Sequence, residues 1–372
     1  MAFNRERIFL GICMLSLVSF FLLGHPVMMD DGSHYEGFAE ALARGKIDFQ
    51  SFYGFQGLSF FAAPVYLLTG SNISIIIASM IFSVLSIPLA YAVGREYWGS
   101  DSAGRIFVAI FFLTTFPMVT LMRGFQESAL LFFILLILYG SFSKKSWTPL
   151  AHGIGAIVKP FSLVLAPLAW KKVFEKGNKI FLVLGILVLA LYGGVNYYQT
   201  GHFVTLGATG SYTGAFDTEN IPPLAKSFTI SIKSILRVPA NLFIASRKIM
   251  VSPLLIILGL WWVFRTKFLR FRKEIILSVL LNALLVGLLT FEFPKYLLPM
   301  TTLLSLMAIP VLEKYRWLIP LVIIDSYFVS LAIYRYHGNV FWDSKLVYYL
   351  PLMTAILIFT YDRHKRLHNN TD

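Results

Sequence analysis

The sequence predicts an all-α integral membrane protein that crosses the bilayer about 10 to 12 times and carries interfacial helices on its outer face. Apolar stretches long enough to span a bilayer follow one another from Ile8 to Tyr361. Of the 372 residues, 57% are hydrophobic and only 14% are charged. A water-soluble fold of this size would therefore have too little polar surface to cover its core.

The first apolar stretch, from Ile8 to Val27, is predicted to be an uncleaved membrane helix. A signal peptide is the alternative, because Arg5 and Arg7 form a basic start before the apolar run. However, no small-x-small cleavage pattern precedes Pro26, and many further spans follow. The uncleaved helix accounts better for both observations.

The basic residues predict the orientation of the chain. They gather in short loops between apolar stretches, which is the positive-inside pattern. The clusters are Arg5 and Arg7; Lys144 and Lys145; Lys171, Lys172, Lys176 and Lys179; Arg265, Lys267, Arg270, Arg272 and Lys273; Lys314 and Arg316; and Arg363, Lys365 and Arg366. With these loops in the cytoplasm, both termini are cytoplasmic. The net charge of +13 then reflects membrane orientation, and no nucleic-acid partner is expected.

The apolar stretches divide into spans of alternating direction. The predicted spans are 8–28, 71–94, 106–122, 125–142, 180–198, 250–264, 275–291, 296–312, 317–334 and 345–361. The segment 147–170 is flanked by two basic clusters that should share one side of the membrane. We therefore expect a short hairpin that turns at Lys159-Pro160, because proline ends or kinks a helix.

Two long segments are predicted on the outer face of a single membrane domain over residues 1–372. The first outer loop, 29–70, is rich in acids and has helical periodicity over 31–42, and a second interfacial helix is expected over 56–69. The second outer loop, 199–249, begins with glycine-rich sequence and continues into an amphipathic helix. Long outer loops and short basic inner loops place the function on the outer face.

An acidic pair, Asp30-Asp31, stands where the first span leaves the bilayer. One interpretation is that either aspartate merely caps the next helix. The other is general-base catalysis, in which a carboxylate removes a proton from an acceptor hydroxyl or amine. Glu127, at the outer end of another span, is predicted to lie at the same membrane level. An Arg123–Glu127 ion pair at helical spacing is the structural alternative for that acid.

In order along the chain, several short motifs resemble the GT-C class of membrane glycosyltransferases. The similarity is with the branch that holds protein O-mannosyltransferases and lipid A aminoarabinose transferases. The motifs are Asp30-Asp31 with Tyr35 and the run from Ala41 to Gly45; Pro64 to Gly70; Tyr91 to Gly99; Pro117 to Glu127; Lys159-Pro160 with Leu165 to Pro167; and Pro294 to Pro299. The resemblance is good over residues 20–170 and thin afterwards. The chain is short for this class, and Asp31 stands where related enzymes often have glutamate.

The resemblance implies an inverting glycosyltransferase that moves a sugar from a polyprenyl phosphate to a glycan, lipid or protein acceptor. It implies that Asp30 is the catalytic base, with Asp31 beside it, and that Glu127 is the second acid near the acceptor. A departing phosphate needs positive charge for stabilisation. The candidate phosphate ligands are Arg123, Lys295, Lys46, Lys233 and Arg237. We expect a bacterial inner-membrane protein with an extracytoplasmic site in contact with the lipid bilayer.

Two other functions stay open. A multi-pass transporter or lipid-linked sugar flippase would also have many spans with both ends inside, and Asp325, in the middle of a predicted span, supports it. An outer-loop polysaccharide polymerase is the second alternative. A divalent metal ion is possible, because His34, Glu36, His202 and His337 are all expected outside, although their spacing matches no metal motif. The only cysteine, Cys13, excludes an internal disulfide.

Overall fold

The protein is helical in every part that its computed structural model describes. These parts are residues 2–23, 31–52, 55–112, 124–176, 179–201, 252–288 and 297–326, and they contain no strand. The helices are α1 (Ala2–Leu23), α2 (Asp31–Ala43), α3 (Gly57–Thr69), α4 (Ser74–Trp98), α5 (Asp101–Phe112), α7 (Glu127–Phe142), α8 (Thr148–Val158), the 3-10 helix η1 (Pro160–Leu165), α9 (Ala166–Lys176), α10 (Ile180–Thr200), α13 (Pro253–Arg265), α14 (Arg272–Leu288) and α15 (Leu298–Lys314). The predicted all-α class is confirmed for the described residues.

The helices begin and end close to the positions predicted from the apolar stretches. The helix expected over 31–42 is α2, the one over 56–69 is α3, and the span over 180–198 is α10. The predicted break at Lys159-Pro160 is also present, since α8 ends at Val158 and η1 begins at Pro160. Because α8 packs against both η1 and α9, this segment folds back on itself. Most of the second outer loop and the span over 345–361 lie outside the described residues.

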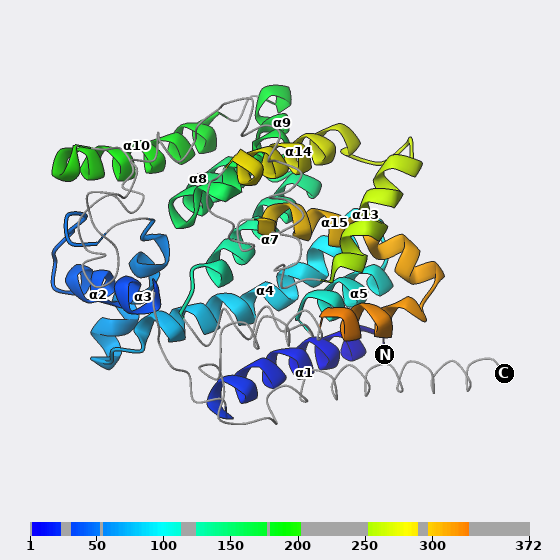
Figure 1. The fold of residues 1–372 in the computed structure, drawn as a ribbon, viewed down its shortest axis with the longest axis horizontal. Helices are drawn as coiled ribbons and strands as arrows, with labels where there is room; N and C mark the ends of the chain where they lie inside the picture. The colour runs from blue at the N-terminus through cyan, green and yellow to red at the C-terminus, as the bar shows by residue number, and fades with distance from the viewer. Residues whose placement is uncertain are drawn as a thin grey trace.

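The long helix α4 runs through the middle of the bundle, with α7 on one side and α1 on the other, and it packs against α1, α5 and α7 (Figure 1). Its apolar side chains join one continuous core with those of α7 and α15. Figure 1 shows α2 and α3 at one end of the bundle, whereas the N-terminus lies at the opposite end. The first outer loop is therefore a cap on one end of a helical bundle.

Two of the described helices, α4 and α10, are long and apolar enough to cross a membrane. α10 is largely uncovered by the rest of the protein, and its exposed side chains include Ile180, Val183, Ile186 and Leu191, which are 51% to 61% exposed. A row of exposed large apolar side chains is unfavourable in water and suits a bilayer. The structure supports apolar bilayer-length helices, but the predicted number of spans is not established by it.

At the end opposite α2 and α3, a basic loop between α13 and α14 closes several helix ends. The Arg270 guanidinium donates to the backbone oxygen of Phe142, the last residue of α7. Arg272 Nε donates to the Val263 oxygen in the last turn of α13, at 3.1 Å. Orphan carbonyls and the negative end of the helix dipole both favour cations at such positions. Part of the basic pattern used to predict orientation therefore also stabilises helix ends.

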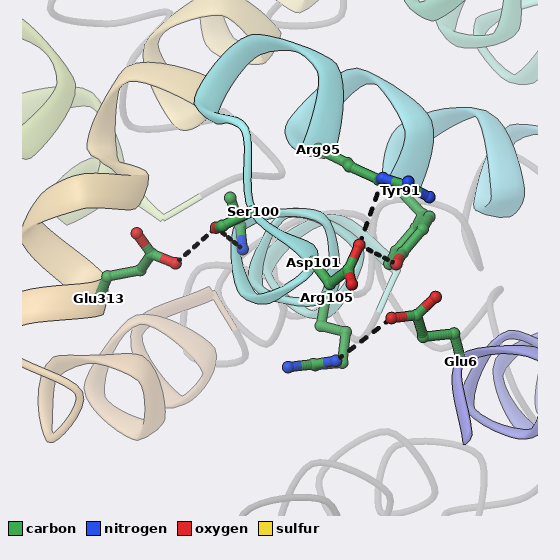
Figure 2. Close-up of polar contacts among 8 residues, drawn as sticks. Glu6, Tyr91, Arg95, Ser100, Asp101, Arg105 and Glu313 are labelled. Atoms are coloured by element: carbon green, nitrogen blue, oxygen red, sulfur yellow. Dashed lines mark hydrogen bonds and ion pairs between the residues drawn. The ribbon is translucent and has the colours of Figure 1, made fainter. Parts of the chain in front are cut away.

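A second polar cluster, at the same end, ties α1, α4, α5 and α15 together (Figure 2). Asp101 accepts a hydrogen bond from the Tyr91 hydroxyl at 2.9 Å and lies 3.3 Å from Arg95 Nε. Hydrogen bonding to the Glu6 carboxyl and to Tyr91 lowers the pKa of Asp101. Ser100 completes the cluster by donating to Glu313 at 3.2 Å. The acids in this cluster serve contacts between helix ends.

Candidate functional site

A buried ion pair joins two inner helices at the end of the bundle where α2 and α3 lie. Glu127 is the first residue of α7, and its carboxylate accepts from the ammonium of Lys159, which follows the last residue of α8. The side chain of Glu127 is 1% exposed and that of Lys159 is 9% exposed. Burying two charges carries a desolvation cost, so this pair marks a position where charge is retained inside the protein.

The local sequence explains why these two side chains can meet. Lys159 has an extended backbone, with φ −154° and ψ 134°, as expected for the residue before a proline. Pro160 ends α8 there and starts η1, so Lys159 lies at a break between two helices. Glu127 lies in the first turn of α7, where the helix dipole favours a negative charge. Both charged groups are thus at helix ends.

The first outer loop contacts the sequence neighbours of both members of this ion pair. Gln126, which is fully buried, donates to the backbone oxygen of Phe55. A Cβ added to Gly57, the first residue of α3, would lie 2.4 Å from the Val158 Cα. Only glycine allows the backbones of α3 and α8 to approach this closely. The start of α3 therefore lies against the residues that neighbour Glu127 and Lys159 in sequence.

The first turn of α2 also lies close to the turn that precedes Glu127. Gly124 has a positive φ of +67°, and a Cβ built on it would lie 3.8 Å from the Gly32 Cα in the first turn of α2. The turn that precedes Glu127 is therefore next to the start of the helix whose first residue is Asp31. The structure brings together the backbone after the acidic pair and the backbone before Glu127.

The remaining acids of the first outer loop have structural partners. Glu36 is buried, and its two carboxylate oxygens accept from the Ser74 hydroxyl and the Ile75 amide, both at 2.7 Å. It thereby caps the start of α4 from a neighbouring helix. Asp48 accepts from the Ser51 hydroxyl at 2.6 Å and from the Ser51 amide at 2.9 Å. These hydrogen bonds lower the pKa of Asp48.

The loop after α2 is hydrogen-bonded to the last turn of α10. Gln199 accepts from the Phe49 amide at 2.9 Å and donates to the Ile47 oxygen at 2.6 Å. Phe49 also belongs to a small aromatic core that it forms with Phe38 and Tyr192. Lys46, one of the predicted phosphate ligands, is exposed on this loop and is not part of the buried junction. The last turn of α10 is thus anchored to the first outer loop.

Most of the predicted site residues are not placed by the structure. Asp30, Arg123, Lys233, Arg237 and Lys295 lie outside the described residues, as do His202 and His337. For Asp31 the backbone is described but the side chain is not. Their catalytic and phosphate-binding roles, and those of Lys46 and Glu127, remain predictions.

One partner of Glu127 was not predicted from the sequence. Among the described residues, the cation that pairs with Glu127 is Lys159, 32 positions along the chain, whereas Arg123, the predicted partner four residues away, lies outside the described residues. One signal pointed to Lys159. Lys159 is the only charged residue in the otherwise apolar stretch from Trp147 to Trp170, and such a residue normally has a partner.

Two further polar groups considered in the sequence have structural explanations. Asp325, the main support for a transporter, accepts from the Ser252 hydroxyl and from the Leu254 amide at 3.4 Å, and so caps the start of α13. Among the described residues, no group of three or more histidine, cysteine or acidic side chains is placed to hold a metal ion. Since Glu36 already binds the start of α4, a metal site that includes Glu36 does not fit the structure.

The arrangement of helices is that of the GT-C membrane glycosyltransferase fold. The described structure is similar to the crystal structure of ArnT from Cupriavidus metallidurans bound to undecaprenyl phosphate, with a TM-score of 0.55 and 14% sequence identity. The match covers 90% of this chain and 64% of that protein, so the chain spans less than two thirds of its length. No family model and no curated protein matches the sequence. The predicted GT-C resemblance is confirmed at the level of the fold.

Proposed function

We propose that this protein is an inverting glycosyltransferase that moves a sugar from a polyprenyl phosphate to an extracytoplasmic glycan, lipid or protein acceptor. The observation that carries the proposal is the fold, which is similar over 90% of this chain to ArnT bound to undecaprenyl phosphate. The buried Glu127–Lys159 pair beside the start of α2 adds support, because it gives that end of the bundle a charged junction. We place the protein in a bacterial inner membrane, with both termini in the cytoplasm.

The proposed chemistry needs one base and a cationic phosphate site. Asp30 accepts the proton of an acceptor hydroxyl or amine. At the same time the acceptor oxygen or nitrogen forms a bond to the anomeric carbon of the sugar. The bond from that carbon to the phosphate oxygen breaks, and the polyprenyl phosphate leaves as an anion. Attack opposite the leaving group inverts the anomeric centre. Phosphate is a good leaving group when cations stabilise it, so no second carboxylic acid is required.

The cationic side of the site is proposed to come from outer-face basic residues. The candidates are Arg123, Lys295, Lys46, Lys233 and Arg237. Lys46 is the one among them that the structure describes, and its exposure leaves it accessible to a headgroup at the membrane surface. Asp31 is proposed to assist Asp30, and Glu127 to contact the acceptor.

The testing experiment uses purified full-length protein in lipid nanodiscs with a radiolabelled polyprenyl-phosphate sugar and membrane extracts as acceptor. Wild type is compared with Asp30→Asn and with the control Glu40→Gln. Glu40 is an acid of the same loop, and it forms an exposed pair with Arg44, which directly follows α2. We expect covalent transfer by wild type and by the control, and a loss of about 100-fold or more in Asp30→Asn.

Three results would argue against the proposal. Equal transfer by Asp30→Asn and wild type would remove Asp30 as the base. Movement of the intact lipid-linked sugar across proteoliposome membranes, without any covalent product, would favour a flippase or transporter. Extension of a lipid-linked glycan chain as the only product would favour the polymerase.

A further inference from the structure

The Glu127–Lys159 pair differs from the other ion pairs of the described residues in its burial. Lys171 and Glu274 also pair between two helices, but their side chains are 36% and 19% exposed and lie at the opposite end of the bundle. Arg44 and Glu40 are more exposed still. Replacing a deeply buried ion pair by apolar side chains is often neutral or even stabilising. Stability alone therefore gives no reason to keep two charges at this position.

The surroundings of the pair indicate what the charges can act upon. Each member has a sequence neighbour that holds the first outer loop: Gln126 binds Phe55, and Val158 packs on Gly57. The turn before Glu127 lies against the first turn of α2, directly after the proposed base. A displacement of Glu127 would therefore disturb the start of α2, the helix that directly follows the proposed base in the sequence.

We propose that Lys159 is a positioning residue of the transferase site, which fixes the carboxylate of Glu127 so that Glu127 orients the acceptor while Asp30 removes its proton. This inference rests on the proposed function. A carboxylate already paired with an ammonium is a fixed negative charge that can accept a hydrogen bond from the acceptor.

The experiment measures kcat and KM for donor and acceptor in the nanodisc assay. The double variant Lys159→Met/Glu127→Gln removes both charges and leaves no lone buried ion, so it avoids the severe destabilisation expected of either single change. Glu127→Asp keeps the charge but withdraws the carboxylate by one methylene. The matched control is Lys171→Met/Glu274→Gln, which removes a more exposed interhelical pair.

We expect both changes at the Glu127–Lys159 pair to lower kcat by about 100-fold, because misplacement by about 1 Å can cost that much. KM for the donor should be unchanged, and thermal unfolding of both variants should match that of the control. Wild-type kcat in either folded variant would overturn the inference and make the pair purely structural. Absence of transfer by wild type would instead contradict the proposed function, so the two failures are distinguishable.

Discussion

Individual acidic residues in this protein differ in what they bind, and that difference separates structural acids from candidate catalytic ones. Glu36 and Asp325 accept hydrogen bonds at the starts of α4 and α13, and Asp48 organises a turn. Glu127 is instead paired with a buried lysine. Partners reached through the tertiary fold thus decide the role of each acid, and the sequence alone does not identify them.

Glu36→Gln should destabilise the protein, because glutamine offers one acceptor oxygen where the carboxylate offers two. One of the two groups at the start of α4, the Ser74 hydroxyl or the Ile75 amide, then loses its partner. We expect a loss of about 1 to 3 kcal/mol in the free energy of unfolding. Thermal unfolding in detergent measures it, with the exposed Glu40→Gln as the control. Equal melting of the two variants would contradict the capping role.

Asp48 should make the outer loop sensitive to acid. Its pKa in the folded protein is lowered by hydrogen bonds from Ser51, so its stabilising contribution is present above the ordinary aspartate pKa of about 3.9. That contribution is lost as the pH falls through the lowered value. Asp48→Asn should melt below wild type at neutral pH, and the gap should close as the pH falls below about 3.9. A gap that does not vary with pH would contradict this origin.

At the scale of helices, the close contact of α3 with α8 builds the candidate site. Gly57→Ala would place a Cβ against the Val158 backbone and force the two helices apart. We expect a loss of about 1 to 3 kcal/mol in stability, which thermal unfolding measures. Transfer activity should fall in parallel, because α3 carries the outer loop.

Gly11→Ala is the matched control for this prediction. Gly11 lies inside α1, and a Cβ there meets nothing within 4 Å. Alanine is the better helix former, so this change should raise stability by about 0.5 to 1 kcal/mol. Equal effects of the two substitutions would contradict the close backbone contact between α3 and α8 at Gly57 and Val158.

The positions of the helices could be predicted from the sequence because their apolar stretches are long and proline marks a break between them. The bounds of α2, α3 and α10 follow from periodicity, and Pro160 predicts the end of α8. The Glu127–Lys159 pair was not predictable in the same way. Spacing rules apply within one helix, whereas these two residues belong to different helices and meet through packing.

At the scale of the whole molecule, the bundle has two chemically different ends. The acidic first outer loop caps the end of α7 that begins with Glu127, and the basic loop with Arg270 closes the end at Phe142. This polarity agrees with the predicted orientation, in which basic loops face the cytoplasm. In that orientation the proposed site faces outward, as the proposed use of a lipid-linked sugar donor requires.

Cysteine labelling tests this orientation. Lys46→Cys and Lys267→Cys are placed singly in a Cys13→Ala background, since both lysines are exposed and Cys13 is buried. In intact bacteria whose outer membrane has been made permeable, a membrane-impermeant maleimide should label Lys46→Cys. It should label Lys267→Cys only after the inner membrane is opened. The reverse pattern would invert the topology and place the proposed site in the cytoplasm.

The central claim is that a polyprenyl phosphate is used where α2, α3, α7 and α8 meet. The most direct measurement is photocrosslinking of purified protein in nanodiscs with a polyprenyl phosphate that carries a photoreactive group near its phosphate, followed by peptide mapping. We predict crosslinks in peptides that contain Gly57, Glu127 or Lys159, and competition by unlabelled undecaprenyl phosphate. Competed crosslinks confined to the opposite end, around Asp101 and Arg270, would contradict the account.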